Sequence, residues 1–198
     1  IAMAPIPSGG IGLAFYDRVA GTINVAARAA EGWQVVVVDG GVDSDVGVGA
    51  SLTIDANTVW HLAYVDGYSE SLKYARVKDG EVEVIETIDD GLGISGVPFP
   101  DGQHVVGDDT SIVVNGQGVV TISYQDATNG QLRFATGEPT ATGRNWTVRV
   151  LEQDAFGGFF SKQLNIGGGV KVMQWSRKLT TLENGTKRGV GDVSFLSP

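Results

Sequence analysis

The segment Val48–Asp55, with the sequence VGASLTID, begins a unit that continues with LAYVD at 62–66 and LKYA at 72–75. Three other segments match LAYVD, namely LAFYD at 13–17, ISYQD at 122–126 and, more weakly, VMQWS at 172–176. The first three copies start at residues 13, 62 and 122, which are 49 and then 60 residues apart. Because one order of segments returns along most of the chain, the sequence predicts an architecture built from repeats of a single unit.

Each unit contains four short segments that are rich in Val, Ile, Thr and aromatic residues and are bounded by Gly, Asn or Asp, a composition typical of β-strands. Segments 71–74, 81–88 and 146–151 alternate apolar and polar residues, which predicts strands with one exposed face. The first and second segments of each unit are more continuously apolar, so we expect them to be covered on both faces. Four antiparallel strands in units of roughly 40 to 60 residues are typical of β-propeller blades, and the predicted fold class is an all-β propeller.

The predicted blades lie near residues 1–39, 48–89, 106–153 and 159–195, and the last has only three strand-like segments. Since residues 1–5 already align with the innermost strand of the first blade, no segment is left to complete the fourth. We therefore expect part of a six- to eight-bladed ring, completed by another protein chain or a second copy, because open end sheets expose apolar surface that soluble monomers rarely tolerate. The alternatives are a four-bladed ring with an imperfect seam and a two-sheet sandwich.

The pattern V-G-x-x-x-S-L-x-x-D, then A-Y-x-D, then L-x-Y-A resembles the repeat of bacterial secreted or surface β-propellers and is loosely similar to the sialidase-like superfold. Its best copy is formed by 48–55, 63–66 and 72–75. The resemblance implies the architecture and an extracellular or cell-surface location in bacteria, but it implies no activity, since one fold hosts many functions. The sialidase Asp-box, S-x-D-x-G-x-x-W, is not matched, because DANTVW at 55–60 only approximates its turn.

The chain of 198 residues carries 14 Lys and Arg against 23 Asp and Glu, a net charge of −9, and has no Cys. This acidity argues against nucleic acid or an anionic membrane surface as a partner. The absence of Cys excludes disulfides, zinc–cysteine sites and thiol catalysis. No apolar stretch is long enough for a membrane-spanning helix, so we expect no membrane insertion. Residues 1–10 lack the basic and apolar regions of a signal peptide, and we expect a mature chain without one.

In a propeller, the loops that join one blade to the next share a face with the turns between second and third strands. Twelve of the fifteen aspartates lie in these two kinds of segment, which predicts an acidic loop face. We interpret Asp17, Asp66 and Asp126, which recur at one position of the repeat, as structural turn residues. Calcium takes oxygens from loop carboxylates, although Asp is also common in turns for structural reasons. The candidate calcium ligands are Asp43, Asp45, Asp108 and Asp109.

The segment 89–110 is longer than its counterparts, and loops of this length are often functional. The candidate ligand-binding residues are Phe99, Asp101 and His104 in this segment, together with Tyr68, an aromatic residue suited to stacking on a sugar ring. His104 is also the better of the two histidines as an acid–base group. A second insertion, 177–188, is basic and contains Asn184-Gly185, which predicts a hairpin turn.

No catalytic residue can be assigned from spacing alone. The sequence therefore predicts a non-catalytic binding or structural propeller that contacts proteins or glycans through its acidic loop face. One alternative is a glycosidase or lyase that uses loop carboxylates near the propeller axis, because two facing carboxylates can cleave a glycosidic bond. The other alternative is a lectin supported by calcium.

Overall fold

The computed structural model describes residues 1–92, 102–153, 161–166 and 169–198, which form fifteen β-strands in four antiparallel sheets. The first sheet contains β1 (Ala2–Pro5), β2 (Ile11–Asp17), β3 (Thr22–Ala29) and β4 (Gly32–Gly40), and the second contains β5 (Val46–Ile54), β6 (Trp60–Asp66), β7 (Ser71–Lys78) and β8 (Glu81–Asp89). The third contains β9 (Val106–Val114), β10 (Val120–Asp126), β11 (Gln131–Pro139) and β12 (Arg144–Glu152), and the fourth contains β13 (Lys162–Ile166), β14 (Gly169–Thr181) and β15 (Lys187–Leu196). None of these residues belongs to a helix long and apolar enough to cross a membrane.

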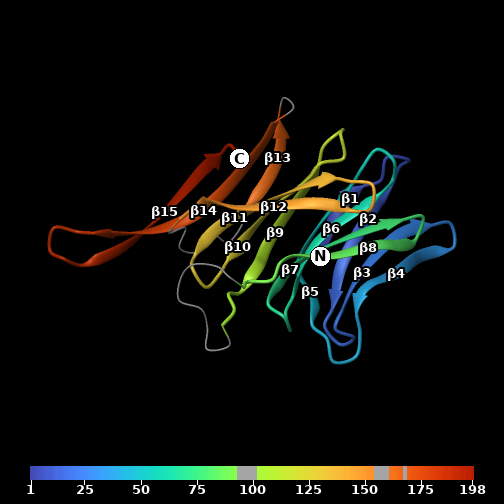
Figure 1. Ribbon diagram of the computed structural model, residues 1–198, viewed down its shortest axis with the longest axis horizontal. Helices are drawn as coiled ribbons and strands as arrows, with labels where there is room; N and C mark the ends of the chain where they lie inside the picture. Colours follow the sequence, from blue (N-terminus) through green and yellow to red (C-terminus); the bar gives the residue numbers. More distant parts are fainter. Residues whose placement is uncertain (93–101, 154–160, 167–168) are drawn as a thin grey trace.

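Within each sheet the strands pair in the order of the sequence. The first strands of neighbouring sheets lie together, because β5 packs beside β1 and β2, and β9 packs beside β5 and β6. The predicted all-β class and its four-stranded antiparallel sheets are thereby confirmed, and the described part of the fourth sheet has three strands. Figure 1 places the first and fourth sheets at opposite ends of the row, so the described residues form an open arc and neither a sandwich nor a closed four-bladed ring.

Apolar side chains from facing sheets form the core. Ile23 and Val25 of β3 belong to one buried cluster with Leu62 and Tyr64 of β6. The second and third sheets enclose Leu72, Tyr74, Ile122 and Tyr124, and the third and fourth enclose Leu132, Phe134 and Val172. Burying one Leu, Ile or Val side chain contributes about 1.5–3 kcal/mol. Each sheet therefore depends on its neighbours for stability.

The first strands of the second and third sheets share a backbone irregularity near their beginnings. Gly47 of β5 and Gly107 of β9 have positive φ angles of 117° and 97°. A Cβ atom added to Gly47 would lie 2.7 Å from the Ile23 Cβ, and one added to Gly107 would lie 2.9 Å from the Leu72 Cα. Ile23 and Leu72 belong to the third strand of the preceding sheet, so glycine allows adjacent sheets to approach closely here.

The turns between second and third strands use the recurring aspartates as the sequence predicts. Asp17, Asp66 and Asp126 each accept hydrogen bonds from backbone N–H groups two or three residues later, at 2.9–3.2 Å. This is the ordinary way in which an aspartate stabilises a turn. Each aspartate therefore stabilises its own turn, and Asp126 also contacts the buried His104.

β14 and β15 form a long hairpin that extends past β13. β13 pairs with residues 169–173 of β14, so residues 174–181 pair with β15 alone. The predicted turn at Asn184-Gly185 is confirmed, because the Leu182 N–H donates to the Thr186 carbonyl at 2.8 Å. In Figure 1 the end of this hairpin projects away from the row of sheets.

Candidate functional site

The loops that join consecutive sheets meet the turns between second and third strands at one end of the molecule, as predicted. The Gly67 N–H donates to the Asp45 carbonyl at 2.7 Å, and the Ala127 N–H donates to the Val105 carbonyl at 2.9 Å. Each bond joins a connecting loop to a neighbouring turn. We call this end the loop face, and it comprises residues 17–22, 39–46, 66–71, 89–92, 102–106 and 126–131.

A carboxylate at the end of the fourth strand ties the first sheet to the second. Asp39 of β4 accepts hydrogen bonds from the Tyr64 hydroxyl (2.9 Å) and the Lys73 ammonium (2.5 Å), both in the second sheet. Asp66 lies 3.9 Å from the same ammonium. The side chains of Asp39 and Lys73 are 17% and 15% exposed, so their charges neutralise each other with little contact to solvent. We call this arrangement an inter-sheet latch.

A second latch repeats the first between the second and third sheets. Asp89 of β8 accepts hydrogen bonds from the Tyr124 hydroxyl (2.6 Å) and from the Arg133 guanidinium. Asp89 lies opposite Leu72 of β7, the position that Asp39 has in the first sheet relative to β3. The repeated strand register therefore places an acid, a tyrosine and a cation at both junctions.

At a third junction a carboxylate again bonds to the next sheet, but no cation stands opposite the residue that donates to it. Glu152, at the end of β12, accepts a hydrogen bond from the Gln174 amide of the fourth sheet. Gln174 takes the place of Tyr64 and Tyr124 in the repeat, and the residue opposite it is Ser194. The carboxylate at the end of the fourth strand thus bonds to the next sheet at all three described junctions.

Burial raises the pKa of both latch tyrosines above the ordinary value for a phenol, and the neighbouring carboxylate adds to the effect. The carboxylate is Asp39 for Tyr64 and Asp89 for Tyr124. Both hydroxyls consequently stay protonated and act as hydrogen-bond donors. A carboxylate held by a phenol and a cation is suited to a structural role rather than to proton abstraction.

The first sheet lacks the receiving half of a latch. The residue that corresponds to Tyr64 is Phe15 in β2, and opposite it stands Asn24 where the second sheet has Lys73. The Asn24 amide donates to the Thr22 hydroxyl of its own strand at 2.9 Å. A neighbouring sheet that packs on the outward face of the first sheet would therefore meet no buried cation. Such a sheet would not need a carboxylate at the end of its fourth strand.

The structure buries His104, one of the predicted ligand-binding residues, at 1% exposure. Its Nδ1 lies 3.3 Å from the Asp126 carboxylate and 3.0 Å from the Asn129 amide nitrogen. These contacts join the segment before β9 to the turn after β10. Burial and these partners favour a structural role for His104 over the predicted contact with a ligand.

Of the other predicted ligand-binding residues, the structure describes Tyr68. Tyr68 is 84% exposed in the turn after β6, where its ring is available for stacking. Phe99 and Asp101 lie outside the described residues. A hollow of about 280 Å³ beside β2 and the beginning of β5 is lined by other residues, including Phe15, Tyr16 and Ala50.

Three of the four candidate calcium ligands, Asp45, Asp108 and Asp109, make hydrogen bonds within the protein. The Asp45 carboxylate accepts a hydrogen bond from a tyrosine hydroxyl of β2, and the Asp108 carboxylate accepts one from the Asp109 N–H at 2.9 Å. The Asp109 carboxylate accepts a hydrogen bond from the Ser161 N–H at 2.8 Å. Asp43 has a positive φ of 64° in the loop before β5. In the described parts of the chain, no three His, Cys, Asp or Glu side chains form a group suited to a metal ion.

The latches were missed in the sequence, although it contains a signal for them. A tyrosine occupies the centre of two strands that the sequence predicts to be covered on both faces. Directly opposite each tyrosine, the next strand carries a cation, Lys73 in one repeat and Arg133 in the other. Because a buried cation requires a partner, this pairing points to a carboxylate from another sheet.

Comparisons with known proteins show the fold. No family model matches the sequence, and no curated protein matches it. The structure is similar to that of a Hadza microbial sialidase, with a TM-score of 0.60 and 11% identity over 100% of this chain and 45% of that chain. A glycoside hydrolase family 43 arabinoxylan arabinofuranohydrolase from Bacillus subtilis gives 0.49 and 14%, over 94% of this chain and 48% of that chain.

A Cellvibrio cellulosa α-L-arabinanase gives a TM-score of 0.45 and 9% identity, over 96% of this chain and 76% of that chain. The chain spans about half the length of the sialidase and of the arabinofuranohydrolase. At 11% identity, the similarity to the sialidase extends to the fold alone. The chain is all-β, and its four-stranded antiparallel sheets match part of a propeller fold.

Proposed function

We propose that this chain is a non-catalytic structural and binding segment of a secreted or cell-surface β-propeller, whose end sheets are covered by another chain or by a second copy. The observation that carries the proposal is the exposed apolar surface on the outward faces of the first and fourth sheets. In the same proposal, the loop face contacts proteins or glycans, with Tyr68 as its exposed aromatic residue.

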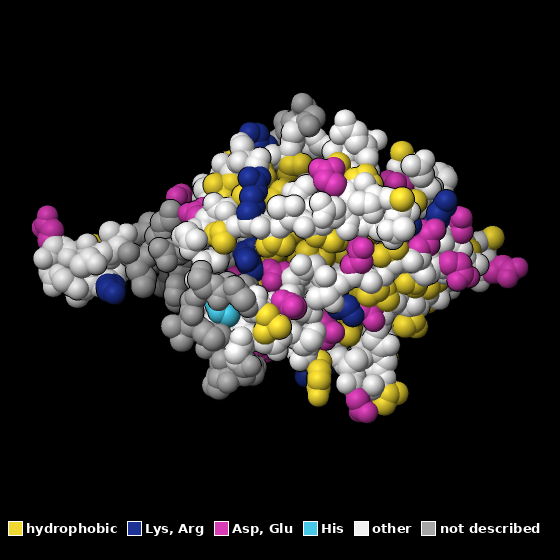
Figure 2. Space-filling model, in the orientation of Figure 1, with side chains coloured by type: hydrophobic (Ala, Val, Ile, Leu, Met, Phe, Trp, Pro, Cys, Tyr) yellow, Lys and Arg dark blue, Asp and Glu magenta, His cyan; other side chains and the backbone are white. Residues whose placement is uncertain are grey.

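The outward face of the first sheet continues the pattern of a buried interface. One row across its four strands consists of Met3, Leu13, Ala26 and Val35. The equivalent row of the second sheet consists of Leu52, Leu62, Ala75 and Ile85, of which the first three are buried against the first sheet. In the first sheet, by contrast, Met3 is 70% exposed and Val35 is 55% exposed. Figure 2 shows apolar side chains at the surface over the first and second sheets.

The outward face of the fourth sheet is also apolar. Val172 faces the third sheet, so the alternate residue Trp175 points the other way, together with Val193 opposite it. The exposed apolar residues in the described part of this sheet include Leu164, Trp175, Val193 and Phe195, at 51%, 40%, 54% and 68%. Monomeric soluble proteins rarely expose contiguous apolar patches larger than a few hundred Å². Exposed apolar side chains at opposite ends of the arc support the proposed association at both ends.

The state of the carboxylates supports a non-catalytic role for the loop face. Asp39 and Asp89 are each held by a tyrosine and a cation, and Asp126 bonds to its own turn. These contacts leave the three carboxylates little freedom to act as an acid–base pair on a substrate. Protein or glycan contacts need no such pair.

Association is tested by the native mass of the chain in solution. We expect species heavier than 20.7 kDa at micromolar concentrations, because the apolar end faces are removed from water when sheets pack on them. Replacing Val35 and Val37 together with lysine should weaken this association by at least about tenfold, since each lysine places a charge on the covered face. Both valines are more than half exposed, at 55% and 58%, so the fold should tolerate the change.

The control for this experiment is Val19→Lys. Val19 is 99% exposed in the turn after β2, away from the outward face, and the association should be unchanged. A wild-type chain that stays at 20.7 kDa and also fails to bind a dye for exposed apolar surface would contradict the proposal.

A further inference from the structure

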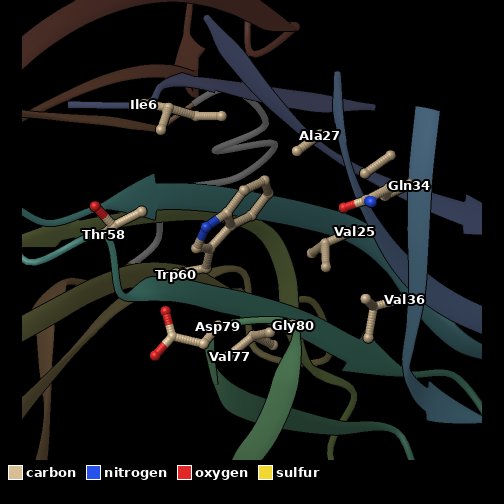
Figure 3. Close-up of a pocket in the computed structure, with 11 residues that line it drawn as sticks. Ile6, Val25, Ala27, Gln34, Val36, Thr58, Trp60, Val77, Asp79 and Gly80 are labelled. Atoms are coloured by element: carbon tan, nitrogen blue, oxygen red, sulfur yellow. The ribbon is translucent and has the colours of Figure 1, made fainter. Parts of the chain in front are cut away.

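A cavity of about 250 Å³ lies between the first and second sheets, at the end of the strands opposite the loop face (Figure 3). Its apolar wall includes Val25, Val36 and Val77, on strands of the two sheets. The cavity is separate from the latches, and Ala26 of β3 is the residue that it shares with the outward row of the first sheet. Nothing in the proposed function uses it.

Four polar side chains surround the cavity. Thr58 comes from the turn after β5, Asp79 from the turn after β7, and Gln34 from the beginning of β4. In Figure 3 the indole of Trp60 lies between Thr58 on one side and Gln34 on the other. The side chains of Thr58, Trp60, Asp79 and Gln34 make no hydrogen bond to another described residue. Gln34 and Asp79 are exposed at the mouth of the cavity, Thr58 is half-buried, and Trp60 is 9% exposed.

Thr58 has a backbone conformation that is costly for its residue type. Its φ is +60°, and a β-branched residue in this left-handed region is a genuine outlier. The same position of the corresponding turn, between the first and second strands, is Gly9 in the first sheet and Gly118 in the third, with φ angles of 108° and 79°. Of these three sheets, only the second carries a side chain there, and that side chain lines the cavity. Strain of this kind is concentrated at ligand sites and active sites.

Trp60 is also particular to the second sheet. The corresponding residues, which stand two positions before the repeated five-residue segment, are Ile11 in the first sheet and Val120 in the third. The indole packs over Gly12 of β2, where a Cβ atom would lie 2.5 Å from the ring. Glycine in the first sheet and tryptophan in the second thus shape the cavity together.

We propose that this cavity binds one ring of a neutral sugar. An indole beside apolar side chains suits the C–H face of a pyranose. Thr58, Asp79, Gln34 and the Trp60 N–H together offer both donors and acceptors, and the hydroxyl groups of a sugar can pair with both. The volume is below the roughly 300–1,000 Å³ of pockets for drug-sized ligands, which fits a single ring. No Lys or Arg lines the cavity, and the Asp79 carboxylate disfavours an acidic sugar.

The inference is tested by titrating the protein with D-glucose, D-galactose, D-xylose and L-arabinose while following the indole N–H signals of its four tryptophans by NMR. The signal of Trp60 is assigned by its loss in Trp60→Phe. We expect at least one of these sugars to shift this signal with a Kd of about 1–10 mM, as befits a ligand of about ten non-hydrogen atoms. The other three tryptophan signals should move less.

Two variants separate binding from folding. Asp79→Asn keeps a residue that tolerates the positive φ of 50° at this position, and it should weaken sugar binding by about tenfold. Glu81→Gln, which removes the same charge from the exposed beginning of β8 outside the cavity, should leave the Kd unchanged. Thr58→Gly should bind sugar more weakly while its Tm is unchanged or higher, because the strain is relieved.

The inference is overturned if none of the four sugars shifts the Trp60 signal at concentrations up to about 100 mM. It is also overturned if Asp79→Asn and Thr58→Gly bind as tightly as the wild type. A chain that fails to associate through its end sheets but passes this test would contradict the proposed function and leave the cavity assignment intact.

Discussion

Replacing Asp89 with alanine is expected to lower the free energy of unfolding by about 3–5 kcal/mol, the usual effect of removing one partner from a buried ion pair. The side chains of Asp89 and Arg133 are 8% and 12% exposed, so the guanidinium would lose its carboxylate in surroundings that water enters little. The Tyr124 hydroxyl would lose its acceptor at the same time. Urea denaturation at pH 7 measures the effect as a lower midpoint with an unchanged slope.

The matched control removes a carboxylate from the other end of the same strand. Glu81→Ala, at the exposed beginning of β8, should change the free energy of unfolding by less than about 0.5 kcal/mol. The double variant of Asp89→Ala and Arg133→Met should lose less stability than the sum of the single variants, because neither charge is then left unpaired. A loss below about 1 kcal/mol for Asp89→Ala would show that the second latch does not hold the sheets together.

The repeated strands and the turn aspartates could be predicted from the sequence because they depend on local features. Asp66, for example, bonds to N–H groups within its own turn, and a residue that recurs at one place in a repeat identifies the turn it serves. The shared end of the connecting loops and turns also follows from strand order alone. Consecutive strands reverse direction at each turn, so strand order fixes the end at which a residue such as Asp45 lies.

The latches could not be predicted with the same reasoning, because they depend on which sheet faces which. Asp89 and Arg133 are 44 residues apart, and only the packing of the second sheet on the third brings them together. His104, which the sequence places in the long segment 89–110, is also buried, and its contacts are to Asp126 and Asn129 in the turn after β10. The acidic composition of the loop segments therefore overstated the acidity of the loop face, since latch carboxylates such as Asp39 are neutralised by the adjoining sheet.

The buried network of His61, Tyr74 and Arg144, also at the junction of the second and third sheets, should make the free energy of unfolding fall as the pH is lowered. His61 is 2% exposed, its Nδ1 lies 2.7 Å from the Tyr74 hydroxyl, and its Nε2 lies 3.6 Å from the Asp55 carboxylate. The same hydroxyl accepts a hydrogen bond from Arg144 Nε at 3.2 Å, so it can donate its own proton to Nδ1 and leave the imidazole proton on Nε2. Burial, followed by the charge of Arg144, lowers the pKa of His61 from 6.5 to about 4.

The direction of the pH effect follows from this lowered pKa. Between pH 6.5 and about 4 the unfolded chain binds a proton at His61 that the folded chain excludes, so stability is complete above pH 6.5 and falls as the pH decreases to about 4. The difference in pKa corresponds to about 3 kcal/mol, at 1.36 kcal/mol for each pH unit. Other groups titrate in the same range, and the comparison with His61→Gln, which does not titrate, isolates the contribution of His61. The free energy of unfolding, measured in urea from pH 7 to pH 4, should decrease more steeply for the wild type than for His61→Gln. Parallel curves for the two proteins would show that His61 can be protonated without loss of its contacts with Tyr74, and that the junction tolerates a second cation beside Arg144.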